Sequence, residues 1–192
     1  MRARAHACLP GLFLMTDADR MRDPLPVLET LAAGTGVILR HYEWPRAQRE
    51  SLARAVAIRC ASRRLRLFIA ADPYLAQRVG AFGCHLPERL GGKLPAWRRL
   101  FPRLRWTIAA HGEKSMIRAR TSAPDAIILS PVFTTRSHKS ARTLGVLRFE
   151  AWARRSSVPV IALGGITGHT ARRLAGSHAA GLAAISGLSV NG

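Results

Sequence analysis

Short apolar runs alternate with helix-like segments along almost the whole chain, and this alternation constrains the fold more than any other feature. Each run is rich in β-branched or other apolar residues and carries few charges. Such near-continuous apolar runs are typical of parallel strands that are buried on both faces. We therefore expect eight strands, at residues 12–16, 36–42, 66–72, 82–86, 106–111, 125–133, 158–166 and 181–187.

The segments between these runs have the pattern of helices. Asp23-Pro24 and Asp72-Pro73 each place a capping carboxylate before a proline, which favours the first helical position. In the longest segment, apolar residues recur at helical spacing from Leu52 to Cys60 and form one face. The expected helices cover residues 24–33, 45–63, 73–79, 113–120, 146–155 and 168–176, and a stripe of Leu94, Trp97 and Phe101 marks one more.

Eight strands with seven intervening helices predict a compact (β/α)8 TIM barrel of the α/β class. We expect a single barrel domain over residues 11–192, preceded by a tail at residues 1–10. Only LSVNG follows Gly187, so the eighth helix is expected to be short or missing. We then expect the flank beside the eighth and first strands to be covered either by the tail at residues 1–10 or by a partner chain. The second alternative would make the protein a homo-oligomer.

The chain is strongly basic, with a formal net charge of +19 and 30 lysines and arginines. A charge of this size raises nucleic acid as a partner. However, the basic residues are almost all arginines, spread through the helix-like segments without a block of like charges or a basic arm. Solvated helix faces explain this pattern better, so nucleic acid is disfavoured as a partner.

Cysteine spacing and hydropathy indicate the compartment. Cys8, Cys60 and Cys84 stand far apart and are odd in number, which argues against a disulfide framework or a zinc site and fits a reducing cytoplasm. The early apolar run is broken by Pro10 and Gly11 and lacks a small-residue cleavage site. No apolar stretch approaches the roughly 18 residues of a membrane span, so we expect a cytoplasmic protein without a membrane partner.

Two pairs of small residues predict a phosphate site. In a TIM barrel the chemistry lies at the C-terminal ends of the strands, and the loops after strands 7 and 8 often bind phosphate through backbone N–H groups. Gly164 and Gly165 follow the seventh predicted strand, and Ser186 and Gly187 follow the eighth. The alternative is that these residues only turn the chain from strand to helix. Their matching places favour phosphate binding.

Charged and titratable residues at other strand ends extend this candidate site. Arg40 lies in an apolar strand, where a guanidinium is costly unless it reaches the barrel mouth or pairs with an anion. Asp72 is able to hold a metal ion or to cap the next helix. His85 and His111 each end an apolar strand, where a histidine serves as a catalyst or as a hydrogen-bonded structural residue. No spacing typical of a dedicated metal cage or a nucleotide-binding loop occurs.

The loop after the sixth strand, LSPVFTTRSHKSARTLG at residues 129–145, is dense in hydroxyls and cations. Thr135, Ser137 and His138 lie near its centre. This composition suits anion binding, although a solvated connection in a basic protein would look similar. The place of the loop at the C-terminal end of a barrel strand favours anion binding.

The motifs, taken in order, resemble those of the thiamine phosphate synthase and TenI superfamily. The resemblance runs from about Leu12 to Gly187. It rests on LFLMTD, an arginine late in the second strand, an aspartate ending the third, G-x-H-L, SPVFTTRSH, PVIALGGI and AAISG. SPVFTTRSH at 130–138 and PVIALGGI at 159–166 are the more specific markers. This superfamily has a compact (β/α)8 barrel, in agreement with the strand count.

The resemblance implies a transferase of thiamine biosynthesis. A thiamine phosphate synthase joins an aminopyrimidine pyrophosphate to a thiazole phosphate and expels pyrophosphate with the help of Mg²⁺. By resemblance, Arg40 would grip the pyrophosphate and Asp72 would be a weak Mg²⁺ ligand, while Thr135 and Ser137 would contact phosphate. The backbone groups that would cradle the thiazole phosphate are those of Gly164, Gly165, Ile185 and Ser186, with Gly187 beside them.

The chain departs from the synthase pattern where that pattern holds pyrophosphate and metal. Losing several charge-assisted contacts is expected to raise the barrier by several kcal/mol, at roughly a few kcal/mol for each donor. Mg²⁺ binds through one or two carboxylates plus substrate phosphates, so Asp72 alone is still compatible with it. The departures are Tyr42 and His138 in place of lysines, Ala71 in place of an asparagine, Ala109 in place of a serine, and Pro87-Glu88-Arg89-Leu90 in place of a metal-binding run.

Two other functions stay open. HLP at residues 85–87 resembles the TenI-type thiazole tautomerases, but the position of their histidine base is Pro131 here, as in the synthases. The other alternative is a protein that binds thiazole phosphate or thiamine phosphate without turnover. The main prediction is a synthase-like transferase acting on phosphorylated thiazole and pyrimidine ligands, with Arg40, Asp72, His111, Thr135, Ser137 and His138 as candidate catalytic residues.

Overall fold

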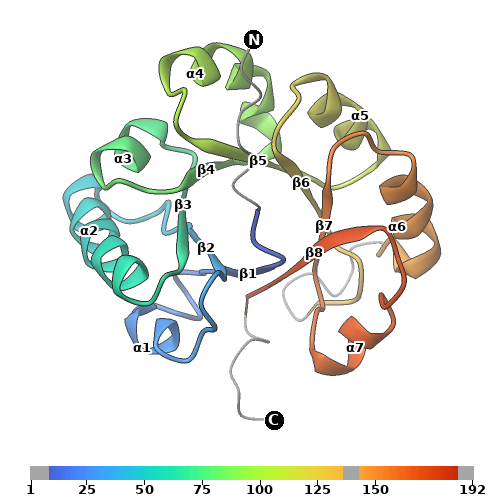
Figure 1. The fold of residues 1–192 in the computed structure, drawn as a ribbon, viewed down its shortest axis with the longest axis horizontal. Coiled ribbons are helices and arrows are strands. Elements are labelled where there is room, and N and C mark those ends of the chain that lie inside the picture. Colours follow the sequence, from blue (N-terminus) through green and yellow to red (C-terminus); the bar gives the residue numbers. More distant parts are fainter. Residues whose placement is uncertain (1–8, 136–142, 186–192) are drawn as a thin grey trace.

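The computed structural model describes residues 9–135 and 143–185, and within them the chain forms a closed barrel of eight parallel strands (Figure 1). The strands pair in chain order, and the last pairs with the first with Phe13 beside Ala183. The predicted (β/α)8 TIM barrel is therefore confirmed. The strands are β1 (Leu12–Met15), β2 (Gly36–Leu39), β3 (Arg66–Ala70), β4 (Gly83–Leu86), β5 (Arg105–Ala110), β6 (Ala126–Leu129), β7 (Val160–Leu163) and β8 (Ala179–Ala184).

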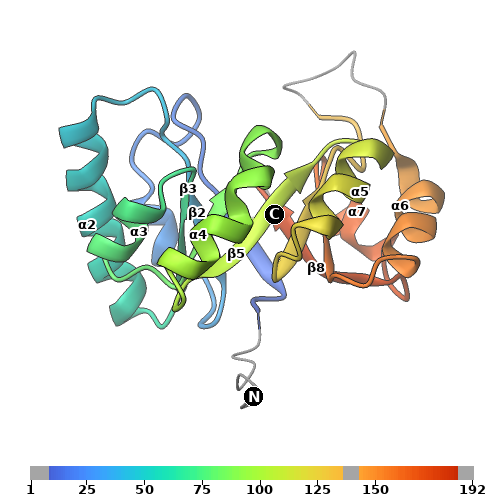
Figure 2. The same cartoon turned by 90° about the horizontal axis from the view of Figure 1, so that it is seen from above.

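Helices surround the barrel, with α2 and α6 on opposite flanks in Figures 1 and 2. A helical segment follows each of the first seven strands, as predicted. A helix after β8 would fall in residues 186–192, which lie outside the described part of the chain. The helices are α1 (Leu25–Leu28), α2 (Arg46–Ser62), α3 (Pro73–Arg78), the 3-10 helix η1 (Glu88–Lys93), α4 (Leu94–Leu100), α5 (Glu113–Thr121), α6 (Gly145–Arg154) and α7 (Gly168–Arg172).

Two helices, α1 and α7, are shorter than the sequence pattern predicts. After α1, the hydroxyl of Thr30 donates to the carbonyl of Val27 at 2.9 Å, a local bond that competes with helix continuation. After α7, the chain passes through turns to Gly176, whose φ of +77° is left-handed. The N-cap of α1 is Pro24 and not Asp23 as predicted, although the Asp23 carboxylate accepts from the backbone N–H of Leu25 at 3.0 Å.

Alternate strand residues fill the barrel interior. Phe13 and Phe68 lie at its centre with ring centroids 5.5 Å apart. The remaining strand residues face the helices and form a second, larger apolar cluster. Because both faces of the strands are buried, their sequences are apolar at nearly every position. The other buried members of the interior cluster are Met15, Ile38, Ala70, Ala126, Ile128, Ile161 and Ala183.

The same alternation decides which polar residues reach the mouth of the barrel. Side chains two residues apart on a strand point to the same side. Asp17, Arg40 and Ser130 each stand two positions after an inward-facing apolar residue, so they continue the interior at the C-terminal strand ends. His85 stands two positions after Gly83 in the same way. The end of the barrel that carries chemistry in this fold is therefore lined with charged and hydrogen-bonding groups.

Two cysteines of the described residues, Cys60 and Cys84, are buried free thiols. Burial raises the pKa of the Cys60 thiol to about 12 and raises that of Cys84 as well. Cys8 lies outside the described residues.

Within residues 9–135 and 143–185, no helix is both long enough and apolar enough to cross a membrane.

Candidate functional site

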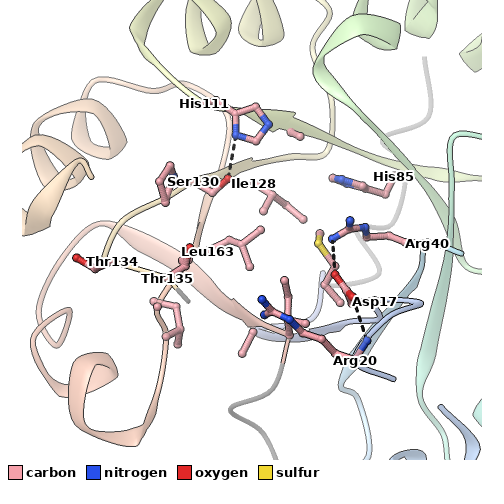
Figure 3. A pocket seen from close by; sticks show the side chains of 18 of the residues that line it. Asp17, Arg20, Arg40, His85, His111, Ile128, Ser130, Thr134, Thr135 and Leu163 are labelled. Atoms are coloured by element: carbon pink, nitrogen blue, oxygen red, sulfur yellow. Dashed lines mark hydrogen bonds and ion pairs between the residues drawn. The ribbon is translucent and has the colours of Figure 1, made fainter. Parts of the chain in front are cut away.

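A cavity of about 1090 Å³ opens at the C-terminal ends of the strands (Figure 3). Its lining comes from every strand end except that of β3. Arg40, His111 and Thr135, which the sequence predicts as catalytic, line this cavity. So do the predicted phosphate-binding residues Gly164, Gly165 and Ile185. The structure thus brings these six predicted residues together in one site.

Four predicted site residues lie outside the described part of the chain. Ser137 and His138 belong to the loop after β6, and Ser186 and Gly187 follow β8. Their roles stay predictions. The described ends of the two segments, Thr135 and Ile185, both line the cavity.

One side of the cavity is cationic. Arg40 follows β2, and its Nη1 lies 3.9 Å from Oδ2 of Asp17, which follows β1. The other oxygen of Asp17 accepts from the backbone N–H groups of Asp19 at 3.2 Å and Arg20 at 3.3 Å. The side chain of Arg20 also lines the cavity and is drawn on the same side as Arg40 in Figure 3. Arg40 therefore reaches the barrel mouth and lies beside a carboxylate, while its role in binding an anion stays a prediction.

Tyr42 contacts two guanidinium groups at this side. Its ring centroid is 5.8 Å from Cζ of Arg40 and 5.7 Å from Cζ of Arg49. An arginine over an aromatic ring is stabilised by the ring quadrupole. Burial raises the pKa of the Tyr42 phenol, and both arginines act against that shift. Tyr42 therefore contacts two cations at this side of the cavity.

His85 is a neutral group in the floor of the cavity. It is buried, and its Nδ1 lies 2.9 Å from the hydroxyl of Thr107. Burial lowers the pKa of His85 to about 3, and the positive charge of Arg40 and the neighbouring His111 add to the shift. At neutral pH His85 therefore donates or accepts hydrogen bonds without carrying charge. A hydrogen-bonded structural histidine was one of the two sequence-based interpretations.

His111 stands at the rim of the cavity, after β5. Its Nδ1 is 3.1 Å from the hydroxyl of Ser130, which follows β6, as Figure 3 shows. The backbone N–H of His111 donates to the hydroxyl of Ser115 at 2.8 Å, which ties the strand end to α5. These two contacts fix the ring and the backbone of His111 beside the ligand space.

The opposite side of the cavity is backbone. Gly164 and Gly165 have φ values of +98° and +64°, which L side chains rarely adopt. A Cβ on Gly165 would lie 2.5 Å from the carbonyl oxygen of Thr134, and one on Gly164 would lie 2.7 Å from Cα of Pro131. The N–H of Phe133 donates to the carbonyl of Gly164 at 3.0 Å. The loops after β6 and β7 are therefore packed backbone to backbone, which only glycine permits here.

Of the predicted catalytic and phosphate-binding residues that the structure describes, Asp72 alone does not line the cavity. Its Oδ1 accepts from the N–H of Leu75 at 2.8 Å and caps α3, as one sequence-based interpretation expected. Its Oδ2 lies 4.0 Å from Nη1 of Arg49. Ala71, just before it, has a φ of +62°, and this turn interrupts the inward alternation of β3. Asp72 is therefore directed toward α3 and α2.

Several lining or supporting residues were not predicted from the sequence as site residues. They are Asp17, Arg20, Ser130, Thr134 and Arg49. A signal for Arg49 exists, because it stands four positions before the buried Ala53 and seven before Val56 and thus shares the apolar face of α2. An arginine on such a face needs a partner.

Comparison with known proteins gives a consistent result. The family model described as thiamine monophosphate synthase matches residues 12–188. A provisionally named thiamine-phosphate synthase from Geobacter sulfurreducens is 31% identical over 184 residues, which cover 93% of this chain and 86% of that protein. A protein of Aquifex aeolicus, provisionally named thiamine-phosphate synthase 2, is 28% identical over 183 residues, covering 93% of this chain and 97% of its own.

Among solved structures, the thiamine phosphate pyrophosphorylase from Pyrococcus furiosus matches with a TM-score of 0.78. The match covers 93% of this chain and 86% of that chain. At 21% sequence identity it supports the fold alone.

Proposed function

Because the chain belongs to the thiamine monophosphate synthase family, we propose that it couples an aminopyrimidine pyrophosphate to a thiazole phosphate and releases pyrophosphate. The observation that carries the proposal is the division of the cavity. Arg20 and Arg40 form a cationic side, and Gly164 and Gly165 form a backbone side. A cavity with these two sides has one place for a leaving pyrophosphate and another for a substrate phosphate.

The proposed reaction exchanges one bond for another without a net proton transfer. The C–O bond between the pyrimidine methylene and pyrophosphate breaks, and its electron pair leaves with the pyrophosphate. The lone pair of the thiazole nitrogen then forms the new C–N bond. Catalysis therefore requires positive charge on the leaving group and close positioning of the two substrates. No acid or base has to act on the reacting carbon.

Arg40 is the proposed partner of the departing pyrophosphate. Its side chain is 30% exposed, and its guanidinium contacts Asp17 and the ring of Tyr42. A planar guanidinium binds phosphate oxygens in pairs, so its orientation matters. Arg20 supplies a second cation from the loop after β1. Arg40 and Arg20 are proposed to take over part of the charge that lysines provide in the synthase pattern.

The thiazole phosphate is proposed to lie against the backbone of Gly164, Gly165 and Ile185. The peptide N–H groups of this segment are proposed to bind the phosphate oxygens, and the two glycines permit the left-handed backbone and the close packing against the loop after β6 that shape it. Thr134 and Thr135 line the same region and offer hydroxyls. Contacts from Ser186 remain a prediction.

When the C–O bond breaks before the new C–N bond forms, the pyrimidine carries a positive charge. The neutral state of His85 suits this proposed cation. A positive charge about 4 Å from another costs several kcal/mol at the effective dielectric constant of a partly buried site. Because burial keeps His85 uncharged at neutral pH, the cavity floor does not repel a pyrimidine cation. His111 is proposed to line the ligand space through its hydrogen bond to Ser130 and to hydrogen-bond a substrate.

Mg²⁺, which the resemblance implies, is poorly matched by the described residues. Among them, no group of three or more His, Cys, Asp or Glu side chains could hold a metal ion. The predicted ligand, Asp72, caps a helix and faces the Arg49 guanidinium. Asp17, the carboxylate in the cavity, faces Arg40. Each of these two carboxylates therefore already has a cation beside it and is a poor ligand for a metal ion.

The test is a direct assay. The purified chain is incubated with both substrates, with Mg²⁺ and separately with EDTA, and thiamine phosphate and pyrophosphate are measured. We expect the two products in equal amounts and strongly reduced turnover in Arg40→Ala. If no thiamine phosphate forms above background at high enzyme concentration, the proposal fails and binding without turnover is favoured. A cytoplasmic location and a homo-oligomer stay predictions.

A further inference from the structure

Arg49 is a partly buried cation beside the cavity, outside its lining. It extends from α2 toward the C-terminal ends of β2 and β3, and its side chain is 12% exposed. Nε donates to the carbonyl of Arg40 at 3.2 Å, and Nη2 donates to the carbonyl of Ala70 at 2.5 Å. Nη1 lies 4.0 Å from Oδ2 of Asp72. One guanidinium therefore meets three oxygens from two adjacent strand ends.

This set of oxygens is the kind that a hard divalent cation uses. Mg²⁺ is bound by carboxylate and carbonyl oxygens together with water and substrate phosphates. Two backbone carbonyls and the Asp72 carboxylate converge here on a positive charge, but the charge belongs to the protein. Two cations at one small cluster would repel each other strongly. The guanidinium therefore excludes a metal ion from the position that it fills.

The burial of Arg49 needs these contacts. A buried cation is stable only when it is paired and its hydrogen bonds are satisfied. Burial lowers the pKa of Arg49, and the carboxylate of Asp72 acts in the opposite direction. A cation with only a structural role would also need to be paired and hydrogen-bonded. The contacts of Arg49 with residues of the cavity distinguish a role in ligand binding from a purely structural one.

Arg49 contacts the cavity through Arg40 and Tyr42. Arg49 donates to the carbonyl of Arg40, and the guanidinium groups of both arginines contact the ring of Tyr42. Arg40, which is proposed to bind pyrophosphate, is thus held at its backbone by Arg49. Its side chain contacts the ring of Tyr42, which Arg49 also contacts.

We propose that Arg49 is a built-in counter-ion that replaces a divalent cation at Asp72, and that it positions Arg40 for metal-independent binding of a diphosphate group. The identity of that group as a leaving pyrophosphate rests on the proposed function. The role of Arg49 as counter-ion and positioning residue does not, since it follows from the contacts of the described residues.

The test measures binding of inorganic pyrophosphate in EDTA by calorimetry, with no turnover involved. In Arg49→Gln we expect affinity to fall at least tenfold. The matched control is Arg54→Gln on the same helix, whose side chain is 56% exposed and pairs with Glu50, and it should bind as the wild type does. Equal affinity in R49Q and wild type would overturn the proposal. If R49Q does not fold, Arg49→Lys decides, with weakened binding expected and unchanged binding contradicting the role.

Mn²⁺ binding, followed by electron paramagnetic resonance, tests the counter-ion role separately. Wild type should show no Mn²⁺ site that depends on Asp72. In R49Q, Mn²⁺ should bind the vacated oxygens and restore pyrophosphate affinity, and the double variant R49Q/D72N should lose this rescue. A merely structural arginine would not be replaced by a metal, so failure of the rescue would overturn the proposal. An Mn²⁺ site in wild type that Asp72→Asn abolishes would overturn it as well. The assay for thiamine phosphate can fail while Arg49 still acts as counter-ion and positioning residue. Conversely, thiamine phosphate can form even if Arg49 has neither role.

Discussion

Asp17 holds Arg40 at the rim of the cavity, with Oδ2 of the carboxylate 3.9 Å from Nη1 of the guanidinium. The carboxylate is itself fixed by the N–H groups of Asp19 and Arg20. A long side chain that is held in place loses less rotamer freedom when a ligand arrives. The pair therefore presents an oriented cation to the ligand, which makes Arg40 the residue whose loss should be felt most.

Arg40→Ala should weaken pyrophosphate binding by about 10- to 100-fold, since a hydrogen bond to a charged group is worth about 1.5–3 kcal/mol. Calorimetric titration with inorganic pyrophosphate measures the change. Arg99→Ala removes an exposed arginine of α4 and controls for the overall charge of the protein. Equal losses in the two variants would mean that net charge, and not Arg40, attracts the anion.

Gly165→Ala should reduce both stability and binding of the thiazole phosphate. The added Cβ would approach the carbonyl of Thr134 to 2.5 Å, at a φ of +64°. Strain of this kind costs about 1–3 kcal/mol. Urea unfolding and ligand titration report the two effects.

Gly168→Ala is the matched control for Gly165→Ala. A Cβ there meets nothing within 4 Å, and Gly168 begins α7. Alanine favours the helical conformation over glycine, so this variant should be neutral or slightly stabilised. If Gly165→Ala bound the thiazole phosphate as strongly as the wild type, the proposed phosphate binding by the backbone at Gly165 would be wrong.

The neutral, buried His85 predicts a pH-dependent stability. Its pKa is about 3 in the folded protein against 6.5 for the free side chain, so below pH 6.5 the unfolded chain binds more protons. The free energy of unfolding should therefore fall with decreasing pH, by up to about 1.4 kcal/mol per pH unit from this residue. Urea unfolding at pH 7.0, 6.0 and 5.0 (roughly the window in which the histidine contribution develops) measures the slope.

His85→Gln should make this slope shallower. The slope should not vanish, because burial also lowers the pKa of His41. His169→Gln, which removes an exposed imidazole from α7, is the control. If His85→Gln and wild type have the same slope between pH 7 and pH 5, the neutral state of His85 in the folded protein is refuted.

Ala71→Gly should stabilise the protein. Ala71 has a φ of +62°, and the left-handed conformation costs a residue with a Cβ about 1–2 kcal/mol. Glycine removes this cost but gains freedom in the unfolded chain, so the net increase should be about 0.5–1 kcal/mol. Ala61→Gly, in an exposed helical position of α2, should have the opposite sign, about 1 kcal/mol less stable. A loss of stability in both variants would contradict the expected strain.

The sequence was most informative where an order of elements or an energetic cost was involved. The alternation of near-continuous apolar runs with helix-like segments predicted the barrel, and the cost of an arginine in an apolar strand indicated that Arg40 reaches the barrel mouth or pairs with an anion. Asp72 shows the limit of that argument. Counting by twos from Phe68 would direct it inward, but the left-handed turn at Ala71 breaks the count. A pattern of residue types does not contain that backbone angle.

Side-chain contacts between the ends of neighbouring strands also could not be predicted from the sequence. The hydrogen bond between His111 and Ser130 depends on how the ends of β5 and β6 are aligned, which follows from the closed barrel and not from either segment. Arg49 is different, because its place on the apolar face of α2 is visible in the spacing to Ala53 and Val56. Its three oxygen partners come from two strands, so its role required the structure.

The backbone contact between the loops after β6 and β7 has one more consequence. Val132 donates to the carbonyl of Leu163 at 2.9 Å and Phe133 to that of Gly164 at 3.0 Å, so the sheet's hydrogen bonding continues past the last assigned strand residues. A phosphate that arrives at Gly164 meets peptide groups that folding has already ordered. Binding there should carry a small loss of conformational entropy, as expected of a preorganised site.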